Sequence, residues 1–146
     1  MIGLLQRVSS ASVAVGGREI ARIGTGLLVL VGVQKDDGEP AAERLLERLL
    51  GYRVFADADG KMNLSLRDTG GGLLLVPQFT LAADTRSGMR AGFSTAAAPS
   101  RARELFAQLH GKAKAAWPGT EAGEFGTDMQ VSLVNDGPVT FWLEAT

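Results

Sequence analysis

One short stretch of the chain, Pro77-Gln78-Phe79-Thr80-Leu81, places an amide, an aromatic ring and a hydroxyl side by side. The preceding apolar run predicts that the stretch lies at the end of a strand. Such a group could bind a polar substrate, and its backbone N–H groups could stabilise an oxyanion. The alternative is a β-bulge that contains a well-placed threonine, since threonine is a good strand former. Residue types alone leave both interpretations open.

A second stretch, Asn135-Asp136-Gly137-Pro138, raises a question about its backbone. Asp-Gly at its centre is typical of a tight hairpin between two strands. The alternative is a cis peptide at Gly137-Pro138, because cis geometry costs an X-Pro bond only about 0.5–1 kcal/mol. Two successive carbonyls would then point the same way beside a residue without a side chain. That arrangement would form a rigid wall of hydrogen-bond acceptors.

The usual catalytic side chains are scarce, because the sequence contains one histidine and no cysteine. A Ser-His-Asp triad would have to use His110. This residue is expected instead at the end of a helix, just before Gly111, where it would cap the helix. No His, Cys and Asp residues have the spacing of metal ligands. We therefore expect an enzyme with this sequence to need no histidine base, metal ion or other cofactor.

Length and composition indicate a single globular domain over residues 1–146. The sequence is 45% hydrophobic and 21% charged, lacks a membrane-spanning apolar run and lacks a signal-peptide pattern, so we expect a cytoplasmic protein. Its net charge of −1 creates no overall attraction to nucleic acid. Contact with RNA would require a local basic edge, for which the candidates are Arg86, Arg90, Arg101, Arg103, Lys112 and Lys114.

Hydrophobic periodicity predicts the elements that must position these residues. Helices are expected in two segments, one after Asp36 or Asp37 as cap and ending at Gly51, and one from Ser100 as cap to Trp117. Strands are expected at 2–15, 18–23, 27–33, 52–57, 61–66, 73–82, 120–126, 129–135 and 139–143. Pro77 should mark an edge, a bulge or a strand end. The fold class is α+β, with a mostly antiparallel, partly barrel-like sheet and two main helices.

The sequence resembles the D-aminoacyl-tRNA deacylases over nearly its whole length. The matching stretches are "QRVSSASV" from Gln6, "GLLVLVGV" from Gly26, "GKMNLSL" from Gly60, "QFTLAADTR" from Gln78 and "FGTDMQVSLVNDGPVTFWLE" from Phe125. The resemblance implies hydrolysis of the ester between a D-amino acid, or glycine mischarged on tRNA(Ala), and the terminal adenosine of tRNA. It also implies a homodimer in which a Gly-cisPro motif, matched by Gly137-Pro138, completes the partner's site and rejects L-amino acids.

The resemblance also assigns roles to individual residues. Gln78, Phe79 and Thr80 match the catalytic motif, and Arg7 matches a position that braces the Gly-Pro motif. Thr80 has been proposed in the family as a nucleophile, but nothing in the sequence supplies a base to activate it. We expect backbone N–H groups near Phe79 and Thr80 to form the oxyanion site instead. The substrate's own 2′-hydroxyl would assist the attacking water.

Two further positions match residues near the terminal adenine, and one position departs from the family. Phe125 and Met129 could sandwich the base, although ordinary core packing is an equal alternative. Pro77 stands where the family usually has serine, as it does in a related deacylase that edits L-alanine. That relative has alanine in place of Phe79, so the D-specific branch is favoured. An editor of a small L-amino acid and an inactive RNA-binding module remain as alternatives.

Overall fold

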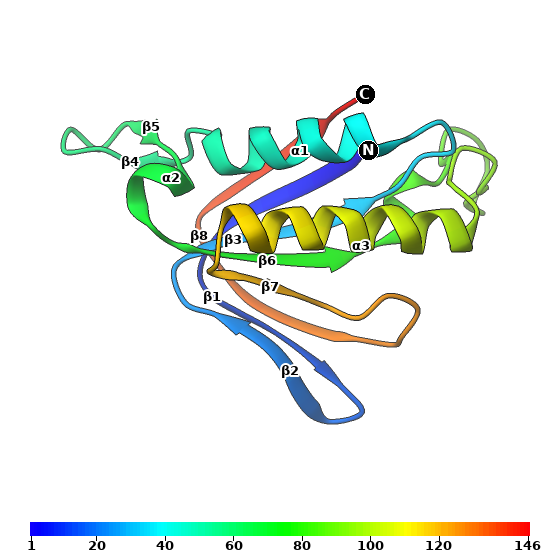
Figure 1. Ribbon diagram of the computed structural model, residues 1–146, viewed down its shortest axis with the longest axis horizontal. Coiled ribbons are helices and arrows are strands. Elements are labelled where there is room, and N and C mark those ends of the chain that lie inside the picture. The colour runs from blue at the N-terminus through cyan, green and yellow to red at the C-terminus, as the bar shows by residue number, and fades with distance from the viewer.

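A curled six-stranded sheet with two long helices over one face forms the framework of the protein (Figure 1). The computed structural model describes residues 1–146. The strands of the sheet are β1 (Ile2–Val15), β2 (Arg18–Ile23), β3 (Gly26–Gly32), β6 (Gly72–Pro77), β7 (Thr120–Ala122) and β8 (Gln130–Glu144). A small separate sheet contains β4 (Phe55–Ala56) and β5 (Met62–Leu64). The helices are α1 (Glu39–Gly51), α2 (Leu66–Thr69), α3 (Pro99–Ala116) and the 3₁₀ helix η1 (Phe79–Ala82).

Strand β1 organises the sheet because it pairs with three other strands. Its first half pairs with β3 and its second half with β2, while β8 runs along its other edge. All these pairs are antiparallel, whereas β3 with β6 and β6 with β7 are parallel. The sheet curls until β2 approaches β6 and β7. The predicted class, a mostly antiparallel and partly barrel-like sheet with two main helices, is confirmed.

The core lies on both faces of the sheet, as the alternation of buried residues along β3 illustrates. Leu27 and Val29 face the helices and join the larger apolar cluster, whereas Leu28 faces the inside of the curl and joins a smaller one. The predicted stripe of α1 is confirmed, since each of its members is buried: Ala42, Leu45, Leu46, Leu49 and Leu50. Burial of one leucine side chain stabilises the fold by about 1.5–3 kcal/mol.

Three predicted helix caps are wrong. Helix α1 has Gly38 as its N-cap, because the carboxylate of Asp37 is engaged elsewhere. Helix α3 begins at Pro99, whose fixed φ suits a first helical residue, so Ser100 lies inside the first turn. His110 does not cap a helix end, because α3 continues to Ala116 and keeps its apolar stripe as far as Ala113.

Four predicted strands are shorter than expected, since the one predicted at 52–57 covers only Phe55–Ala56 and the one predicted at 120–126 only Thr120–Ala122. The strand predicted at 73–82 ends at Pro77, and Phe79–Ala82 turn into the helix η1. The strand predicted at 61–66 ends at Leu64, because Ser65 and Asp68 form a capping box that starts α2. The prediction that Pro77 marks a strand end is confirmed.

The predicted hairpin at Asp136-Gly137 is wrong, because β8 does not reverse. Asn135 pairs with Val8 and Thr140 pairs with Gln6, so both halves of β8 run the same way along β1. Residues 136–139 therefore lie opposite Arg7 alone and project from the ladder as a bulge. The Gly137–Pro138 peptide bond is cis, as the alternative hypothesis expected.

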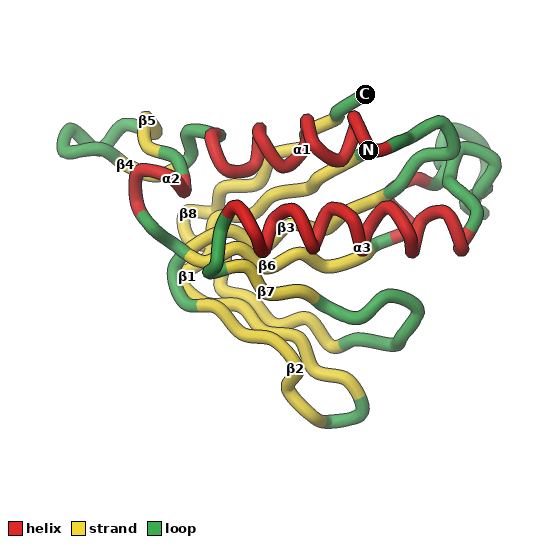
Figure 2. The backbone as a smooth tube through the Cα atoms, viewed as in Figure 1, coloured by secondary structure: helices red, strands yellow, loops and turns green.

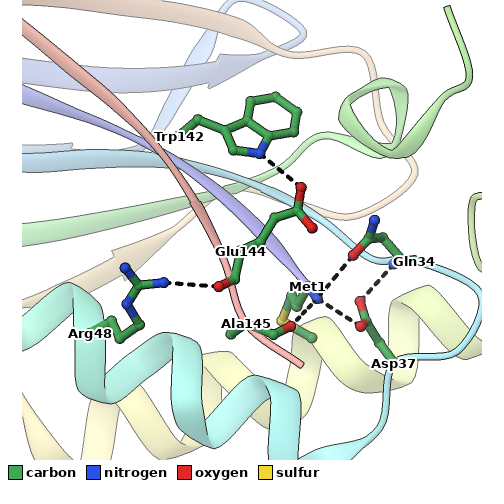
Figure 3. Close-up of polar contacts among 7 residues, drawn as sticks. All are labelled: Met1, Gln34, Asp37, Arg48, Trp142, Glu144 and Ala145. Carbon is green, nitrogen blue, oxygen red and sulfur yellow. Dashed lines mark hydrogen bonds and ion pairs between the residues drawn. The ribbon is translucent and has the colours of Figure 1, made fainter. Parts of the chain in front are cut away.

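A buried ion pair joins the two ends of the chain to the loop before α1 (Figure 3). The ammonium of Met1 lies 2.7 Å from Asp37 Oδ1 and donates a hydrogen bond of 2.6 Å to the carbonyl of Ala145. The other carboxylate oxygen of Asp37 accepts the backbone N–H of Gln34 at 2.7 Å. The side chains of Met1 and Asp37 are 0% and 6% exposed.

None of the helices has the length and the apolar composition that crossing a membrane requires.

Replacement of Asp37 by asparagine should destabilise the fold, because it leaves the ammonium of Met1 buried without a counter-charge. We expect a loss of about 3 kcal/mol in the free energy of unfolding, which lowers Tm by roughly 10 °C. Thermal melts followed by circular dichroism measure the effect. Asp36→Asn is the matched control, because Asp36 is exposed and forms no ion pair. Equal melting temperatures for the two variants would contradict the structural role of the pair.

Candidate functional site

A cavity of about 520 Å³ opens at the carboxyl end of β6. Its wall combines the end of β6, the start of η1, the first turns of α3 and the connection from β7 to β8. The long loop 83–98 and the β7–β8 connection lie at the same end of the sheet (Figure 2). The principal side chains of the wall are Pro77, Gln78, Phe79, Phe125, Met129 and Val131. The structure therefore brings together four of the predicted site residues: Gln78, Phe79, Phe125 and Met129.

Pro77 ends β6 without breaking the sheet. Gln78 N–H donates to the carbonyl of Val31 on β3, whereas Leu73 N–H donates to that of Gly119, on the side of β7. Odd-numbered residues of β6 therefore direct their N–H groups towards β7, which ends at Ala122. The nitrogen of Pro77 points beyond that end, where no ladder bond is lost.

Thr80 lies at the exposed start of η1, next to the cavity. Its hydroxyl has one hydrogen bond, which it accepts from the side-chain amide of Gln78. No imidazole or carboxylate contacts this hydroxyl, so the structure contains no base that would turn it into a nucleophile. The residues around the opening also lack a group of His, Asp or Glu able to hold a metal ion.

Phe125 and Met129 both line the cavity and both pack against the core. The guanidinium of Arg103 lies 4.9 Å from the centroid of the Phe125 ring and covers it from outside. Met129 packs against Gly123, where a Cβ atom would lie only 2.9 Å from the Met129 sulfur. The two side chains thus present an aromatic ring and a thioether to one space, and core packing fixes both.

The loop over residues 83–98 is held in place beside the cavity. Asp84 pairs through its backbone with Gly92, and its carboxylate accepts two hydrogen bonds of 2.9 Å from Arg86. These bonds lower the pKa of Asp84 to about 2, so the pair stays ionised at neutral pH. Phe93 in the same loop packs against Phe79, with ring centroids 5.4 Å apart. Phe79 still remains 60% exposed at the mouth of the cavity.

Arg7 holds the first part of the β8 bulge from the neighbouring strand. Its Nε donates to the carbonyl of Asp136 at 2.9 Å, and its Nη1 donates to the carbonyl of Val54 at 2.7 Å. Gly137 has a φ of +135°, and a Cβ atom there would lie 2.8 Å from Val139 Cγ2 and 3.0 Å from Arg7 Nη2. The bulge therefore requires glycine at this position.

Asn135 and Thr140 close the neck of the bulge, a role that the sequence analysis missed. The Oδ1 of Asn135 accepts the backbone N–H of Val139 at 2.7 Å, and its Nδ2 donates to Thr140 Oγ1 at 2.8 Å. An asparagine placed just before a predicted turn is a signal for such a side-chain bond to the backbone.

The cavity and the bulge are separate within one chain, because Arg7, Gly137 and Pro138 do not line the cavity. The predicted site residues thus fall into two groups. The first group offers an amide, aromatic rings and a thioether without any ionised base. The second offers backbone carbonyls from a fixed, exposed segment.

The two faces of β8 differ in burial. Its inner face packs against the core through Val131, Leu133, Phe141 and Leu143. The exposed large apolar side chains of β8 are Val134 and Trp142, at 56% and 51%. Because β8 pairs only with β1, its other edge is unpaired.

Comparison with known proteins gives consistent results. A family described as D-Tyr-tRNA(Tyr) deacylase matches residues 4–144. Proteins named D-aminoacyl-tRNA deacylase are 65% identical in Alkalilimnicola ehrlichii and 58% identical in Escherichia coli O81. These matches cover 99% of this chain in both cases and 97% and 99% of the relatives.

Two solved structures have the same fold. One, named c-Myc DNA Unwinding Element Binding Protein, is 35% identical, with a TM-score of 0.95 over 100% of this chain and 99% of that chain. The other, titled as a probable eukaryotic D-amino acid tRNA deacylase, is 17% identical, with a TM-score of 0.85 over 98% of both chains.

Proposed function

We propose that backbone geometry provides both the catalysis and the D/L selectivity of this chain, which belongs to the D-Tyr-tRNA(Tyr) deacylase family and hydrolyses D-aminoacyl-tRNA. The observation that carries this proposal is the cavity, which gathers Gln78, Phe79, Phe125 and Met129 but no ionised base. An enzyme with this substrate is expected to work where proteins are translated, in the cytoplasm.

The terminal adenosine enters the cavity between Phe125 and Met129. A volume of about 520 Å³ is within the usual range for small-molecule sites. An aromatic face and a polarizable thioether both suit a flat purine. Arg103 stacks on Phe125 and holds the ring in place. The ester linked to the ribose then lies at the mouth, next to Gln78 and Phe79.

The hydrolysis uses the N–H groups at the start of η1. The first N–H groups of a helix have no acceptor within the helix, so those of Phe79 and Thr80 are suited to stabilise the oxyanion that forms when water attacks the ester. Gln78 keeps the Thr80 hydroxyl occupied as an acceptor. The 2′-hydroxyl of the substrate assists the water, and the fixed ester geometry lowers the entropic cost of the reaction.

Gly137-Pro138 from a partner subunit acts as the chirality filter. Gly137 has no side chain and Pro138 has no N–H, so the backbone carbonyls of this exposed pair face the substrate as hydrogen-bond acceptors. These carbonyls accept hydrogen bonds from the amino group of the substrate and leave no space for an L side chain. A glycyl ester has no side chain that the filter could exclude, and glycyl-tRNA mischarged on tRNA(Ala) is therefore a substrate as well.

A homodimer completes the site. Within one chain the bulge and the cavity are separate, and the bulge is exposed. The unpaired edge of β8, together with exposed Val134 and Trp142, supports an interface along this strand. Two-fold symmetry would insert each bulge into the cavity of the other subunit.

Three substrates test the function: D-Tyr-tRNA, Gly-tRNA(Ala) and L-Ala-tRNA. We expect release of D-tyrosine and glycine, with L-alanine slower by at least about 100-fold, since steric exclusion of one methyl in a rigid site costs several kcal/mol. Release of labelled amino acid is measured with and without EDTA. Binding without hydrolysis would indicate an inactive RNA-binding module. Preferred hydrolysis of L-Ala-tRNA would indicate the editor of L-amino acids that Pro77 suggests.

Thr80→Ala should retain activity within about tenfold of wild type, because backbone groups stabilise the transition state. The measurement is single-turnover hydrolysis of D-Tyr-tRNA at saturating enzyme. A nucleophile, by contrast, loses on the order of 10⁴-fold or more when it is removed. Such a loss in a folded variant would assign the chemical step to the hydroxyl.

Mixed dimers test whether the site spans two subunits. One subunit carries Gly137→Ala, and the other, with a different tag, carries Gln78→Ala together with Phe125→Ala. Each homodimer should lose most of its activity. The purified heterodimer should recover about half of the wild-type activity, because one of its two sites combines an intact cavity with an intact bulge. No recovery in a stable heterodimer would show that each subunit forms its own site.

A further inference from the structure

The projecting segment of β8 needs support, because residues 136–139 have no strand partners. Unsupported backbone would sample several conformations, each at small cost in free energy. A segment that separates D- from L-amino acids by contact must keep its position to within a fraction of an ångström. The residues that fix the bulge are therefore candidates for control of selectivity, and this step rests on the function proposed above.

Two anchors lie on either side of Gly137-Pro138. Before the pair, Arg7 Nε holds the carbonyl of Asp136 at 2.9 Å. After the pair, Asn135 Oδ1 holds the N–H of Val139 at 2.7 Å. The Gly137–Pro138 peptide group thus lies between two anchored peptide groups. The first anchor comes from the neighbouring strand, whereas the second comes from β8 itself.

Asn135 is in turn fixed by Thr140. Its Nδ2 donates to Thr140 Oγ1 at 2.8 Å across the neck of the bulge. The ladder between β8 and β1 is interrupted after Asn135, which pairs with Val8, and resumes at Thr140, which pairs with Gln6. The amide of Asn135 is half-buried and uses an acceptor and a donor together. An aliphatic side chain could provide neither bond.

We propose that Asn135, oriented by Thr140, is a positioning residue that sets the D/L selectivity of the enzyme by holding Val139 and thereby the projection of Gly137-Pro138. Loss of the amide frees the Val139 side of the bulge while Arg7 still holds the Asp136 side. The carbonyls then move away from the place where an L side chain would collide with them. Hydrolysis of L-aminoacyl-tRNA rises relative to that of D-aminoacyl-tRNA.

A set of variants separates positioning from general damage. Asn135→Ala removes both hydrogen bonds. Asn135→Asp keeps an acceptor for Val139 N–H, and its second oxygen can accept the hydroxyl proton of Thr140. Thr140→Val removes only the orienting partner. Asn63→Ala is the matched control, because Asn63 also makes a side-chain bond within a turn, to Asp57 at 2.8 Å, far along the chain from the bulge.

The readout is the ratio of kcat/KM for D-Tyr-tRNA to that for L-Tyr-tRNA, with Gly-tRNA as a measure of the cavity itself. We expect Asn135→Ala to lower the D/L ratio at least about tenfold and Thr140→Val to lower it about threefold. Asn135→Asp should stay within about threefold of wild type, and Asn63→Ala should match it. Purely structural damage would lower hydrolysis of all three substrates in parallel and leave the ratio unchanged.

The outcome distinguishes this inference from the proposed function. An unchanged ratio in Asn135→Ala, with a lowered ratio in Gly137→Ala, overturns the role of Asn135 and keeps the filter. Unchanged ratios in both variants overturn the filter itself. If Asn135→Ala does not fold, Thr140→Val carries the test, and an unchanged ratio there would falsify the proposal.

Discussion

The pairing of β8 along the whole of β1 is the constraint on which the site depends. Because Asn135 is aligned with Val8 and Thr140 with Gln6, the residues between them have nowhere to lie within the sheet. The ladder thus forces residues 136–139 to project from the sheet at one place and in one direction. Strand β1 is itself fixed on its other edge by β2 and β3, so the base of the projection rests on the most extensively paired strand of the fold.

The same framework explains how an ester hydrolase can lack a histidine base. The wall of the cavity is formed where β6 turns into η1, and contact with the core holds Phe125 and Met129 in this wall. Side chains that only pack, accept or stack need no particular protonation state near neutral pH. The proposed catalysis by fixed N–H groups depends on their placement, which packing provides, rather than on a tuned pKa.

Much of the fold follows from local pattern, and the exceptions have tertiary causes. The alternation in β1 and the stripe of α1 predict their elements, because the periods of two and 3.6 are fixed by backbone geometry.

The sequence could not exclude a hairpin at Asp136-Gly137, since the direction of the chain after the turn is decided by the free edge of β1. Asp37 is a poor helix cap only because Met1, distant in sequence, binds its carboxylate. The alternation of residues in β8 predicts an apolar face. It does not indicate whether that face is covered by the core of the same chain or by a partner. Of the site, sequence motifs predict the cavity residues and Arg7. An asparagine before a turn is a sequence signal for a bond to the backbone, but the position of Asn135 at the neck of a bulge depends on the pairing of β8 with β1.

Pro77 shows how a change at the site can be free of architectural cost. Its nitrogen points past the end of β7, so the sheet loses no hydrogen bond there. Serine at the same position would add an N–H and a hydroxyl at the wall of the cavity, whereas proline adds an apolar ring. The difference between the two residues is therefore confined to the surface that faces the substrate. Since Phe79 and the bulge are separate from the ring of Pro77, the proposed exclusion of an L side chain by Gly137-Pro138 does not require a hydroxyl at position 77.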